Sequence, residues 1–501
     1  METKQRHDHS DYFRRGIEKG SGTRHREETS VRIRKQKREE RMRKRRMKPT
    51  SPIQHVNALN LDIGLLYNGT DPQKLETLTL VRKMLSSDDT PPIGKVVEAN
   101  LLPVFVQFLY RTDNHRMQFE AAWALTNVAS GESKYTKAVI DANAIPPLIA
   151  LLDSPHENVK EQAVWVLGNI SGDCIEYRDL VTRHNIVGAI LRNFKPREQR
   201  ISMIQNMTWT LSNICRGKPA PPLEVIQPFL PALAWLIQHP DEDIISDACW
   251  ALCYITDGDN ERVDEVIKTG VCMRLVELMN HPCSNVQTPA VRTIGNIVTG
   301  SDHATQVVID SGAIPILRGL LEHPKRSIKK ESAWALSNIN AGTQDQIQRV
   351  IDSKAIPIII NMIATEEFSI KKELIWAISN ATSGGSESQI EYLVQTGAIT
   401  GLTSMMDCHD VKIITVILEA FENILKAGQK DCINRGLPNN PYTEFMEQAG
   451  ALEKLEDLQD HDNVQVYNRA VRILEQFFSA ETVTDEPTHQ PTVFDFATGF
   501  Q

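Results

Sequence analysis

The sequence predicts an all-α protein, a right-handed solenoid of about ten stacked helical repeats with a basic N-terminal arm. Three observations predict this fold class. A Trp-centred motif recurs at a nearly constant spacing, a Gly follows each copy, and an apolar stripe at helical spacing accompanies it. A single unit of this kind cannot bury its apolar face alone, so the units are expected to stack on one another.

The repeat is defined by anchor positions that carry Trp or its equivalent. Successive anchors lie 41 to 44 residues apart. This period is typical of armadillo and HEAT repeats, which span ~40–47 residues, and it is too long for tetratricopeptide or ankyrin repeats. A WD40 propeller needs short alternating strands, which the sequence lacks. The anchors are Trp123, Trp165, Trp209, Trp250, Arg292, Trp334, Trp376 and Glu419.

Each repeat contains a polar segment, a helix that begins near a Pro, and a Trp-bearing helix that ends near a Gly. In "GAIPILRGLL", from Gly312, the Pro suits a helix start because its φ is fixed and it lacks an N–H. A Gly after the Trp-bearing helix is expected to end it in the left-handed conformation. In "ESAWALSNI" the predicted buried stripe consists of Ala333, Leu336 and Ile339.

The repeats predict the boundaries of the chain's parts. Residues 71–478 form the repeat region, with atypical terminal repeats expected near 71–95 and 450–478 because terminal repeats cap the stack. Residues 1–48 form the arm and residues 49–70 a flexible linker. Residues 479–501 contain Pro, Thr and acidic residues, and they are predicted to be a disordered tail.

Composition and motifs exclude several classes of protein. Among the 501 residues no apolar run approaches the ~20 residues of a membrane helix, and the N-terminus resembles no secretory signal. The eight cysteines are predicted to be reduced thiols. Cys249 and Cys253 lie one helical turn apart, but no second ligand pair follows at zinc spacing. No nucleophile-elbow, zinc-protease or P-loop motif occurs, so neither an enzyme nor a cofactor is predicted.

An Asn follows the Trp by four residues in most repeats, so both side chains share one helix face. Core packing by Trp and capping by Asn would explain one repeat. Recurrence in six repeats favours binding, because the core positions vary among Leu, Ile and Val and mid-helix Asn has a low propensity. The predicted Trp row and Asn row, on the concave face, are Trp123, Trp165, Trp209, Trp250, Trp334 and Trp376, and Asn127, Asn169, Asn213, Asn296, Asn338 and Asn380.

The chemistry of the two rows predicts an extended, Lys/Arg-rich peptide as ligand. An Asn amide can pair with both N–H and C=O of a peptide backbone. Neighbouring Trp rings form slots for Lys or Arg stems, and a cation gains ~0.5–2 kcal/mol from an indole face. Acidic residues near the slots would select the positive tip. The candidates are Asp247, Glu331 and Glu373, each three residues before a Trp, and Asp173.

Charge is distributed unevenly along the chain. Residues 1–48 carry 18 Lys and Arg against 8 Asp and Glu, a net charge of +10, so the rest carries −19 of the formal total of −9. A basic arm suits an acidic partner, and an acidic body suits basic ligands. An armadillo signalling or junction scaffold is the alternative function, but it would bind acidic partners through a basic surface.

The combined Trp row, Asn row and basic arm resemble the importin α family of nuclear import adaptors, over nearly the whole chain. The resemblance implies a major signal-binding site, in which Gly131, Thr136 and Asp173 clasp a key lysine. It implies a minor site on later repeats. The row breaks between them, at Tyr254 and Arg292, suit two separated basic clusters.

The implied sites are given by residue. The major site is Trp123, Asn127, Gly131, Thr136, Gln162, Trp165, Asn169, Asp173, Asn206, Trp209 and Asn213. The stretch between the sites is Asp247, Trp250 and Tyr254. The minor site is Arg292, Asn296, Glu331, Trp334, Asn338, Glu373, Trp376 and Asn380.

Residues 30–46, "SVRIRKQKREERMRKRR", predict a basic helix capped by Ser30. A solvated tail or a nucleic-acid arm are alternatives, although few aromatic residues interleave for base stacking. The resemblance implies an importin β-binding segment and no direct nucleic-acid binding. It also implies an export receptor of the CAS type with RanGTP as partner, and shuttling between cytoplasm and nucleus. Lys44, Arg45 and Arg46 resemble a localisation signal, so they are expected to occupy the rows and inhibit them.

Overall fold

The computed structural model describes residues 45, 62–86 and 91–478. The predicted arm helix, Lys44, Arg46, most of the linker and the predicted tail lie outside the described residues. The chain divides into two compact regions, residues 1–396 and 397–501, which we call region 1 and region 2. The described residues form helices and loops without a strand.

Region 1 is a succession of short helices, most of them grouped in threes. Its helices are α3 (Leu65–Asn68), α4 (Asp71–Leu85), α5 (Ile93–Glu98), α6 (Leu102–Leu109), α7 (His115–Ala129), α8 (Ser133–Asp141), α9 (Ile145–Leu151), α10 (Glu157–Asp173), α11 (Ile175–Arg183), α12 (Ile186–Asn193), α13 (Ile201–Cys215), α14 (Leu223–Ile226), η2 (Gln227–Phe229), α15 (Leu230–Leu236), α16 (Glu242–Thr256), α17 (Asn260–Lys268), α18 (Cys272–Leu278), α19 (Ser284–Ile297), α20 (Asp302–Asp310), α21 (Ala313–Leu320), α22 (Arg326–Ile339), α23 (Gln344–Asp352), α24 (Ala355–Thr365), α25 (Phe368–Gly384) and α26 (Glu387–Gln395).

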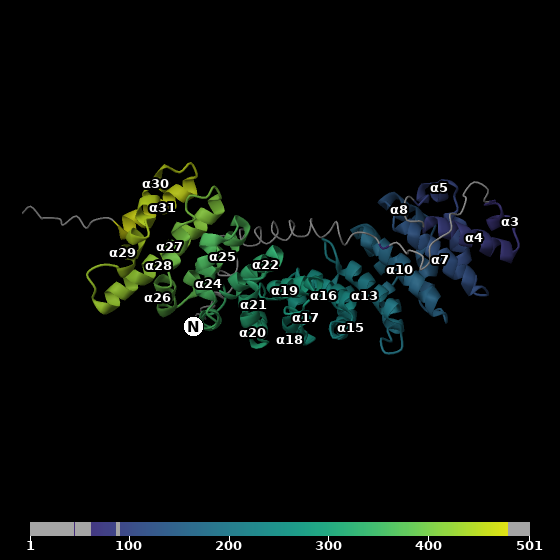
Figure 1. Cartoon of the computed structure of the whole chain (residues 1–501), viewed down its shortest axis with the longest axis horizontal. Coiled ribbons are helices and arrows are strands. Elements are labelled where there is room, and N and C mark those ends of the chain that lie inside the picture. The colour runs from purple at the N-terminus through teal and green to yellow at the C-terminus, as the bar shows by residue number, and fades with distance from the viewer. Residues whose placement is uncertain (1–44, 46–61, 87–90, 479–501) are drawn as a thin grey trace, which may run out of the picture. The chain divides into compact units, whose positions relative to one another are not determined.

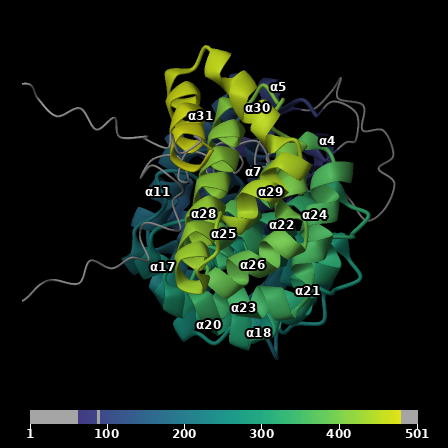
Figure 2. The ribbon, with the colours of Figure 1, turned by 90° about the vertical axis from the view of Figure 1, so that its left-hand side faces the viewer.

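The long third helices carry the Trp motif and pack directly on one another. Helices α7, α10, α13, α16, α19, α22 and α25 follow in this order, each in contact with the next (Figure 1). Helices α17, α18 and α20 lie along one edge of region 1, below α19 and α22 in Figure 1, and α18 and α20 keep that edge in Figure 2. The predicted stripe of Ala333, Leu336 and Ile339 is fully buried, which confirms the helical period.

Left-handed residues occur at a different point of the repeat from the one predicted. Of the glycines expected to end the Trp-bearing helices, only Gly217 has a positive φ, and Gly172 lies inside α10. The positive φ values instead fall just before the second helices, as at Asn143 (60°), Gly312 (84°) and Lys354 (62°). The chain reverses there within one or two residues, and a left-handed residue makes so tight a reversal possible.

A side-chain acceptor closes the turn before many third helices. The Nδ1 atoms of His239, His281 and His323 accept the N–H of the residue two positions later, at 3.0, 3.1 and 2.9 Å. The hydroxyl of Ser154 accepts from the equivalent N–H at 3.2 Å. These bonds satisfy backbone donors where no helix partner is available.

The described helices begin before the predicted boundary at residue 71. Helix α3 lies inside the predicted linker, and its Leu66 is fully buried. Helix α4 packs on α7 and so takes the place of a third helix. Helix α5 begins the next repeat, so the first atypical repeat does not extend to residue 95 as predicted.

Region 2 contains α27 (Ala398–Thr403), α28 (Val411–Arg435), α29 (Pro441–Gln448), α30 (Ala451–Asp457), η3 (Leu458–Asp460) and α31 (Val464–Phe477). Helix α28 is 25 residues long and packs against α29 and α31. Within the described residues of both regions, no helix has the length and apolar character needed to cross a membrane.

Candidate peptide-binding site

Four residues of the Asn row bond their third helix to the backbone of the one before it. An amide N–H of the Asn donates to a backbone carbonyl of the preceding third helix. The acceptor is the residue just before the Asn-row position of that helix. The pairs are Asn169 to Thr126 (3.1 Å), Asn213 to Gly168 (3.0 Å), Asn296 to Cys253 (3.0 Å) and Asn380 to Ser337 (2.9 Å). The Asn296 amide also donates to the Thr256 hydroxyl of the preceding third helix at 3.2 Å.

The Trp row is more deeply buried than predicted. We expected the rings to flank the buried stripe, yet Trp123, Trp209, Trp250 and Trp334 are only 5 to 9% exposed. A ring covers the preceding third helix, because a Cβ on Gly168 would lie 2.4 Å from Cζ3 of Trp209. The indoles therefore contribute to packing between repeats as well as to a surface.

Arg45 shows what the two rows can hold. Its backbone N–H donates to Oδ1 of Asn169 at 3.1 Å, and its carbonyl accepts from Nδ2 of the same residue at 3.2 Å. The carbonyl also accepts the indole N–H of Trp165 at 2.7 Å. Asn169 thus bonds both backbone polar groups of one residue while it keeps its bond to the preceding helix.

The Arg45 side chain reaches the next slot. Its guanidinium carbon lies 4.9 Å from the ring centroid of Trp209, and Nη2 lies 3.0 Å from Oδ2 of Asp247. Asp247 is one of the acids predicted to select a positive tip. Asp173, another of them, instead accepts a hydrogen bond from the Ser133 hydroxyl at 2.6 Å. Backbone and charge are therefore bound by different residues.

Glu331 does not have the free carboxylate that the sequence suggested. Its Oε1 lies 2.5 Å from Nη1 of Arg292, and both residues are buried. The Arg292 guanidinium carbon lies 5.7 Å from the ring centroid of Trp334. Burial by itself would lower the pKa of Arg292. The charge and hydrogen bond of Glu331 outweigh burial, so the pKa of Arg292 is raised. The predicted acid is thus neutralised by a residue of the same face.

The other residues predicted for the major site lie around these contacts. The Thr136 hydroxyl donates to the Ala129 carbonyl at 3.3 Å, and Gln162 is 1% exposed. A Cβ on Gly131 would lie 3.0 Å from side chains of α5 and α8. Asn206 donates to Glu161 at 3.4 Å. Close packing therefore fixes the backbone around Gly131.

Ring stacking and ion pairing occur among the residues predicted beyond the major site. The Tyr254 ring lies 5.7 Å from that of Trp250. Glu373 lies 3.5 Å from Nζ of Lys330. Among the described residues, neither Nδ2 of Asn338 nor the indole N–H of Trp123 has a hydrogen-bond partner, although both atoms are buried. These two donors correspond to the Asn169 and Trp165 atoms that bind Arg45.

Two features of the site were missed from the sequence. A small residue precedes each Asn-row position, and at Gly168 and Gly295 it leaves room for the ring of the next Trp. These residues are Thr126, Gly168, Ser212, Cys253, Gly295, Ser337 and Ser379. This pattern was visible in the repeated motif. Arg82 and Glu120 were also missed, although Arg82 lies 41 residues before Trp123, one repeat length.

Comparisons with known proteins give the family. A model described as "Importin beta binding domain" matches residues 10–92, and one described as "Armadillo/beta-catenin-like repeat" matches 89–130, 132–172, 218–257, 259–299, 301–339 and 343–383. A model for an "Atypical Arm repeat" matches residues 440–492. The chain is 50% identical to Importin subunit alpha-2 of Arabidopsis thaliana, over 98% of this chain and 94% of that protein. This chain belongs to the importin α family.

Other relatives agree with this membership. Importin subunit alpha-1a of Oryza sativa subsp. japonica is 46% identical over 97% of this chain and 96% of its own length. Importin subunit alpha-B of Dictyostelium discoideum is 47% identical over 94% and 93%. An engineered protein with a crystal structure matches with a TM-score of 0.73 and 25% identity, over 82% of this chain and 97% of that chain. The predicted armadillo fold and family are confirmed, and they support an adaptor role in nuclear import.

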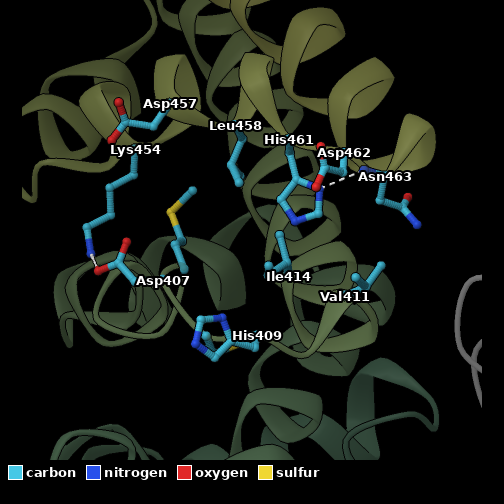
Figure 3. Close-up of a pocket in the computed structure, with 12 residues that line it drawn as sticks. Asp407, His409, Val411, Ile414, Lys454, Asp457, Leu458, His461, Asp462 and Asn463 are labelled. Carbon is cyan, nitrogen blue, oxygen red and sulfur yellow. Dashed lines mark hydrogen bonds and ion pairs between the residues drawn. The ribbon is translucent and has the colours of Figure 1, made fainter.

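This member of the importin α family also has a cavity of about 560 Å³ in region 2, drawn in Figure 3. Lys454 and Asp407 form an ion pair of 2.5 Å at the cavity, and His461 accepts the Asn463 N–H at 2.9 Å. No aromatic ring of a Trp, Tyr or Phe lines it. The described residues contain no group of three or more His, Cys, Asp or Glu that could hold a metal ion. The cavity therefore lacks the chemistry of the two rows.

Alanine at Gly168 is expected to destabilise the protein and weaken peptide binding. The added Cβ would displace the Trp209 ring, and such overpacking costs ~1–3 kcal/mol. Gly319 of α21 is a matched control, because its Cβ would meet no atom within 4 Å. Gly319→Ala should be neutral or stabilise by ~0.5–1 kcal/mol. Chemical denaturation and peptide titration measure both effects, and equal behaviour of the two variants would contradict the packing role of Gly168.

Glu419 of α28, where the Trp row ends, is expected to make region 2 pH-sensitive. Burial, with a smaller contribution from the charge of Glu422, raises the pKa of Glu419 to about 7, although Arg469 and Lys426 oppose the rise. Because the pKa of Glu419 is raised in the folded state, its contribution to the free energy of unfolding is present at acidic pH. That contribution is lost as the pH rises through about 7. The loss should reach at most about 3 kcal/mol.

Hydrogen exchange of the α28 amides between pH 5 and 8.5 measures this dependence. Glu419→Gln should keep the slow exchange at pH 8, because an amide carries no charge to bury. Glu453→Gln, at an exposed position of α30, is the control and should leave the profile unchanged. An unaltered profile in Glu419→Gln would show that other groups set the pH response.

Proposed function

We propose that this chain is a nuclear import adaptor that binds Lys/Arg-rich signals of cargo proteins along the Trp and Asn rows. The observation that carries the proposal is the set of contacts around Arg45. The backbone N–H and carbonyl of one basic residue are bonded by Trp165 and Asn169. Its charge lies between an indole and a carboxylate.

The same contacts explain why the ligand is defined by charge and extension. Two amide contacts and one indole contact bind backbone groups that every residue has, so they select an extended chain without reading its sequence. The slot formed by Trp209 and Asp247 adds a preference for a cation. Repetition of the two elements along successive helices supplies a periodic site for a basic peptide.

Two separated sites follow from the pattern of the rows. The row residues Trp123, Trp165 and Trp209 precede the breaks at Tyr254 and Arg292, and Trp334 and Trp376 follow them. We assign the first group to a major site, the second to a minor site, and Trp250 to the stretch between the two sites. A ligand with two basic clusters joined by a spacer would engage both, and a single cluster would engage one.

The arm has a second role in this proposal. Arg45 belongs to the basic segment Lys44–Arg46, so the chain's own residue holds the position of a cargo residue. A linker of ~25 residues gives such a segment an effective concentration up to the millimolar range. The arm would compete with cargo until importin β binds it, and release by importin β would couple loading of the two partners.

Partners and location complete the proposal. The arm binds importin β, and a CAS-type export receptor with RanGTP returns the chain to the cytoplasm, so the protein shuttles between the compartments. No enzymatic activity, cofactor or direct nucleic-acid contact is part of this function. The acidic charge of the body, −19 outside the arm, favours basic cargo over the acidic partners of a signalling scaffold.

Fluorescence polarisation tests the proposal in the full chain with Lys44, Arg45 and Arg46 replaced by alanine. A labelled Lys/Arg-rich peptide should bind, and a poly-glutamate peptide should not. Asp173→Lys and Asp247→Lys in the same background should each weaken binding of the basic peptide strongly. The first places a positive charge in the proposed major site, and the second places one in the stretch between the two sites, where Asp247 pairs with Arg45. Binding of the acidic peptide, or basic-peptide binding that neither charge reversal changes, would refute the assignment.

A further inference from the structure

Two arginines of the solenoid repeat the arrangement that Arg45 makes. The guanidinium carbon of Arg82 lies 3.9 Å from the ring centroid of Trp123, and its Nε and Nη2 contact the Glu120 carboxylate at 2.6 and 3.1 Å. Arg292 stacks over Trp334 in the same way and pairs with Glu331. Each set therefore joins a guanidinium, an indole and a carboxylate.

The three carboxylates occupy equivalent positions in the repeat, but the indoles do not. Arg82 and Arg292 each stack on the Trp of the helix that carries their carboxylate, whereas Arg45 stacks on Trp209 of the helix before Asp247. Glu120 lies three residues before Trp123, as Glu331 does before Trp334 and Asp247 does before Trp250. Arg82, one repeat before Trp123, stands at the Trp-row position of α4. The Asn-row position of α4 is Ser86, whose hydroxyl accepts from Asn127 at 2.9 Å. Arg82, which stands in the Trp row, thus fills a slot between an indole and a carboxylate. Arg45 fills a slot of the same kind between Trp209 and Asp247.

We propose that Arg82 is a specificity-determining residue: a built-in cation that closes the slot before Trp123 and ends the stretch in which ligand charge is read. This inference rests on the proposed function. Arg82 is only 7% exposed and holds Glu120 by two hydrogen bonds. A ligand Lys or Arg arriving there would meet a like charge, an occupied indole face and a neutralised carboxylate.

The indole N–H of Trp123 is a second, independent indication that a ligand backbone binds at the Trp123 end of the Trp row. It is buried and has no hydrogen-bond partner in the described part of the chain, whereas the equivalent N–H of Trp165 donates to the Arg45 carbonyl. A ligand carbonyl would satisfy it. The ligand backbone is therefore bound as far as Trp123, but a basic side chain directed past Trp123 toward α4 finds its slot filled.

A purely structural brace would contain the same Arg82–Glu120 pair, so the test must measure charge selection. The background is the full chain with Lys44, Arg45 and Arg46 replaced by alanine. Four fluorescent peptides share one basic core and carry one additional Lys or Ala at the N-terminal or C-terminal end. The measured quantity is the ratio of Lys-extended to Ala-extended affinity at each end, with and without Arg82→Ala.

With Arg82 present, both ratios should be within about 2-fold of unity. In Arg82→Ala, the Lys-extended peptide should gain about 3- to 10-fold over the Ala-extended one, at one end only, because the freed Trp123 face and Glu120 then accept its cation. Arg82→Gln keeps a hydrogen-bond donor near Glu120 and removes the charge. Arg82→Gln should show the same gain in relative affinity for the Lys-extended peptide, at the same end only. It replaces Arg82→Ala in the test if the alanine variant folds poorly.

Ratios that stay near unity at both ends in both variants would overturn the inference and leave Arg82 a brace. That result differs from a failure of the proposed function, in which the basic core itself would not bind when Arg82 is intact. Salt dependence adds a check, since the gain in Arg82→Ala should shrink as ionic strength rises.

Discussion

Replacing Lys44, Arg45 and Arg46 with alanine in the full chain is expected to tighten binding of a Lys/Arg-rich peptide by roughly 10- to 100-fold. The reason is competition. Arg45 occupies Trp165, Asn169 and the Trp209 slot, and a tethered segment acts at a high local concentration. The substitutions leave the rows intact and remove the competitor, so the peptide meets an open site. Peptide titration by fluorescence polarisation at two salt concentrations measures the change.

The control replaces three basic residues elsewhere in the arm, Lys35, Lys37 and Arg38, with alanine. It removes the same net charge from the arm and leaves the segment that contains Arg45 unchanged. Affinity should then stay within a few-fold of that of the unmodified chain. An equal gain in both variants would attribute the effect to the charge of the arm in general, and an affinity unchanged in both would exclude autoinhibition by Lys44–Arg46.

Asn169→Ala, made in the chain that already lacks Lys44, Arg45 and Arg46, is expected to weaken binding of the same peptide by about 30-fold. The amide of Asn169 makes two hydrogen bonds to the backbone of one residue at 3.1 and 3.2 Å. Loss of both costs ~2 kcal/mol. Because these bonds involve only backbone groups, peptides of different sequence should lose similar amounts. Titration of two unrelated basic peptides measures this uniformity.

Asn340 provides the matched control for the structural part of the effect. It is fully buried, lies outside the Asn row, and donates to the Ala377 carbonyl of the next helix at 3.1 Å. Asn340→Ala should therefore lower the free energy of unfolding by ~1 kcal/mol, as Asn169→Ala does through its lost bond to Thr126. Only Asn169→Ala should weaken binding of the peptide. If the two variants bind it equally well, the Asn row has a packing role alone.

These predictions separate two explanations that the sequence presented as alternatives. Recurring Trp and Asn were interpreted either as core and capping residues or as a binding surface. In the structure the same side chain can have both properties. Asn169 bonds both the Thr126 carbonyl and Arg45. Trp209 covers Gly168 and also lies beside the Arg45 guanidinium. The packing contacts fix the orientation of the groups that would bind a peptide. A rigid row of this kind reduces the entropy lost when an extended ligand binds.

The sequence by itself determined the repeat, its helical class, the register of the Trp and Asn rows and the buried stripe. It could do so because a helix places residues i and i+4 on one face, and because the same spacing is repeated along the chain. Local turn chemistry was harder to predict. The left-handed residues precede the second helices, as at Lys354, and no Gly marks that position there.

Only the tertiary structure decided which charges remain for a ligand. Glu331 and Asp247 have the same position in their repeats, yet Glu331 pairs with Arg292 and Asp247 with Arg45. Glu120 pairs with Arg82, a residue 38 positions away in the sequence. Such pairs form between successive helices, across a distance that a periodic sequence pattern does not encode. Whether a carboxylate is neutralised depends on which side chain the neighbouring helix brings within about 3 Å of it.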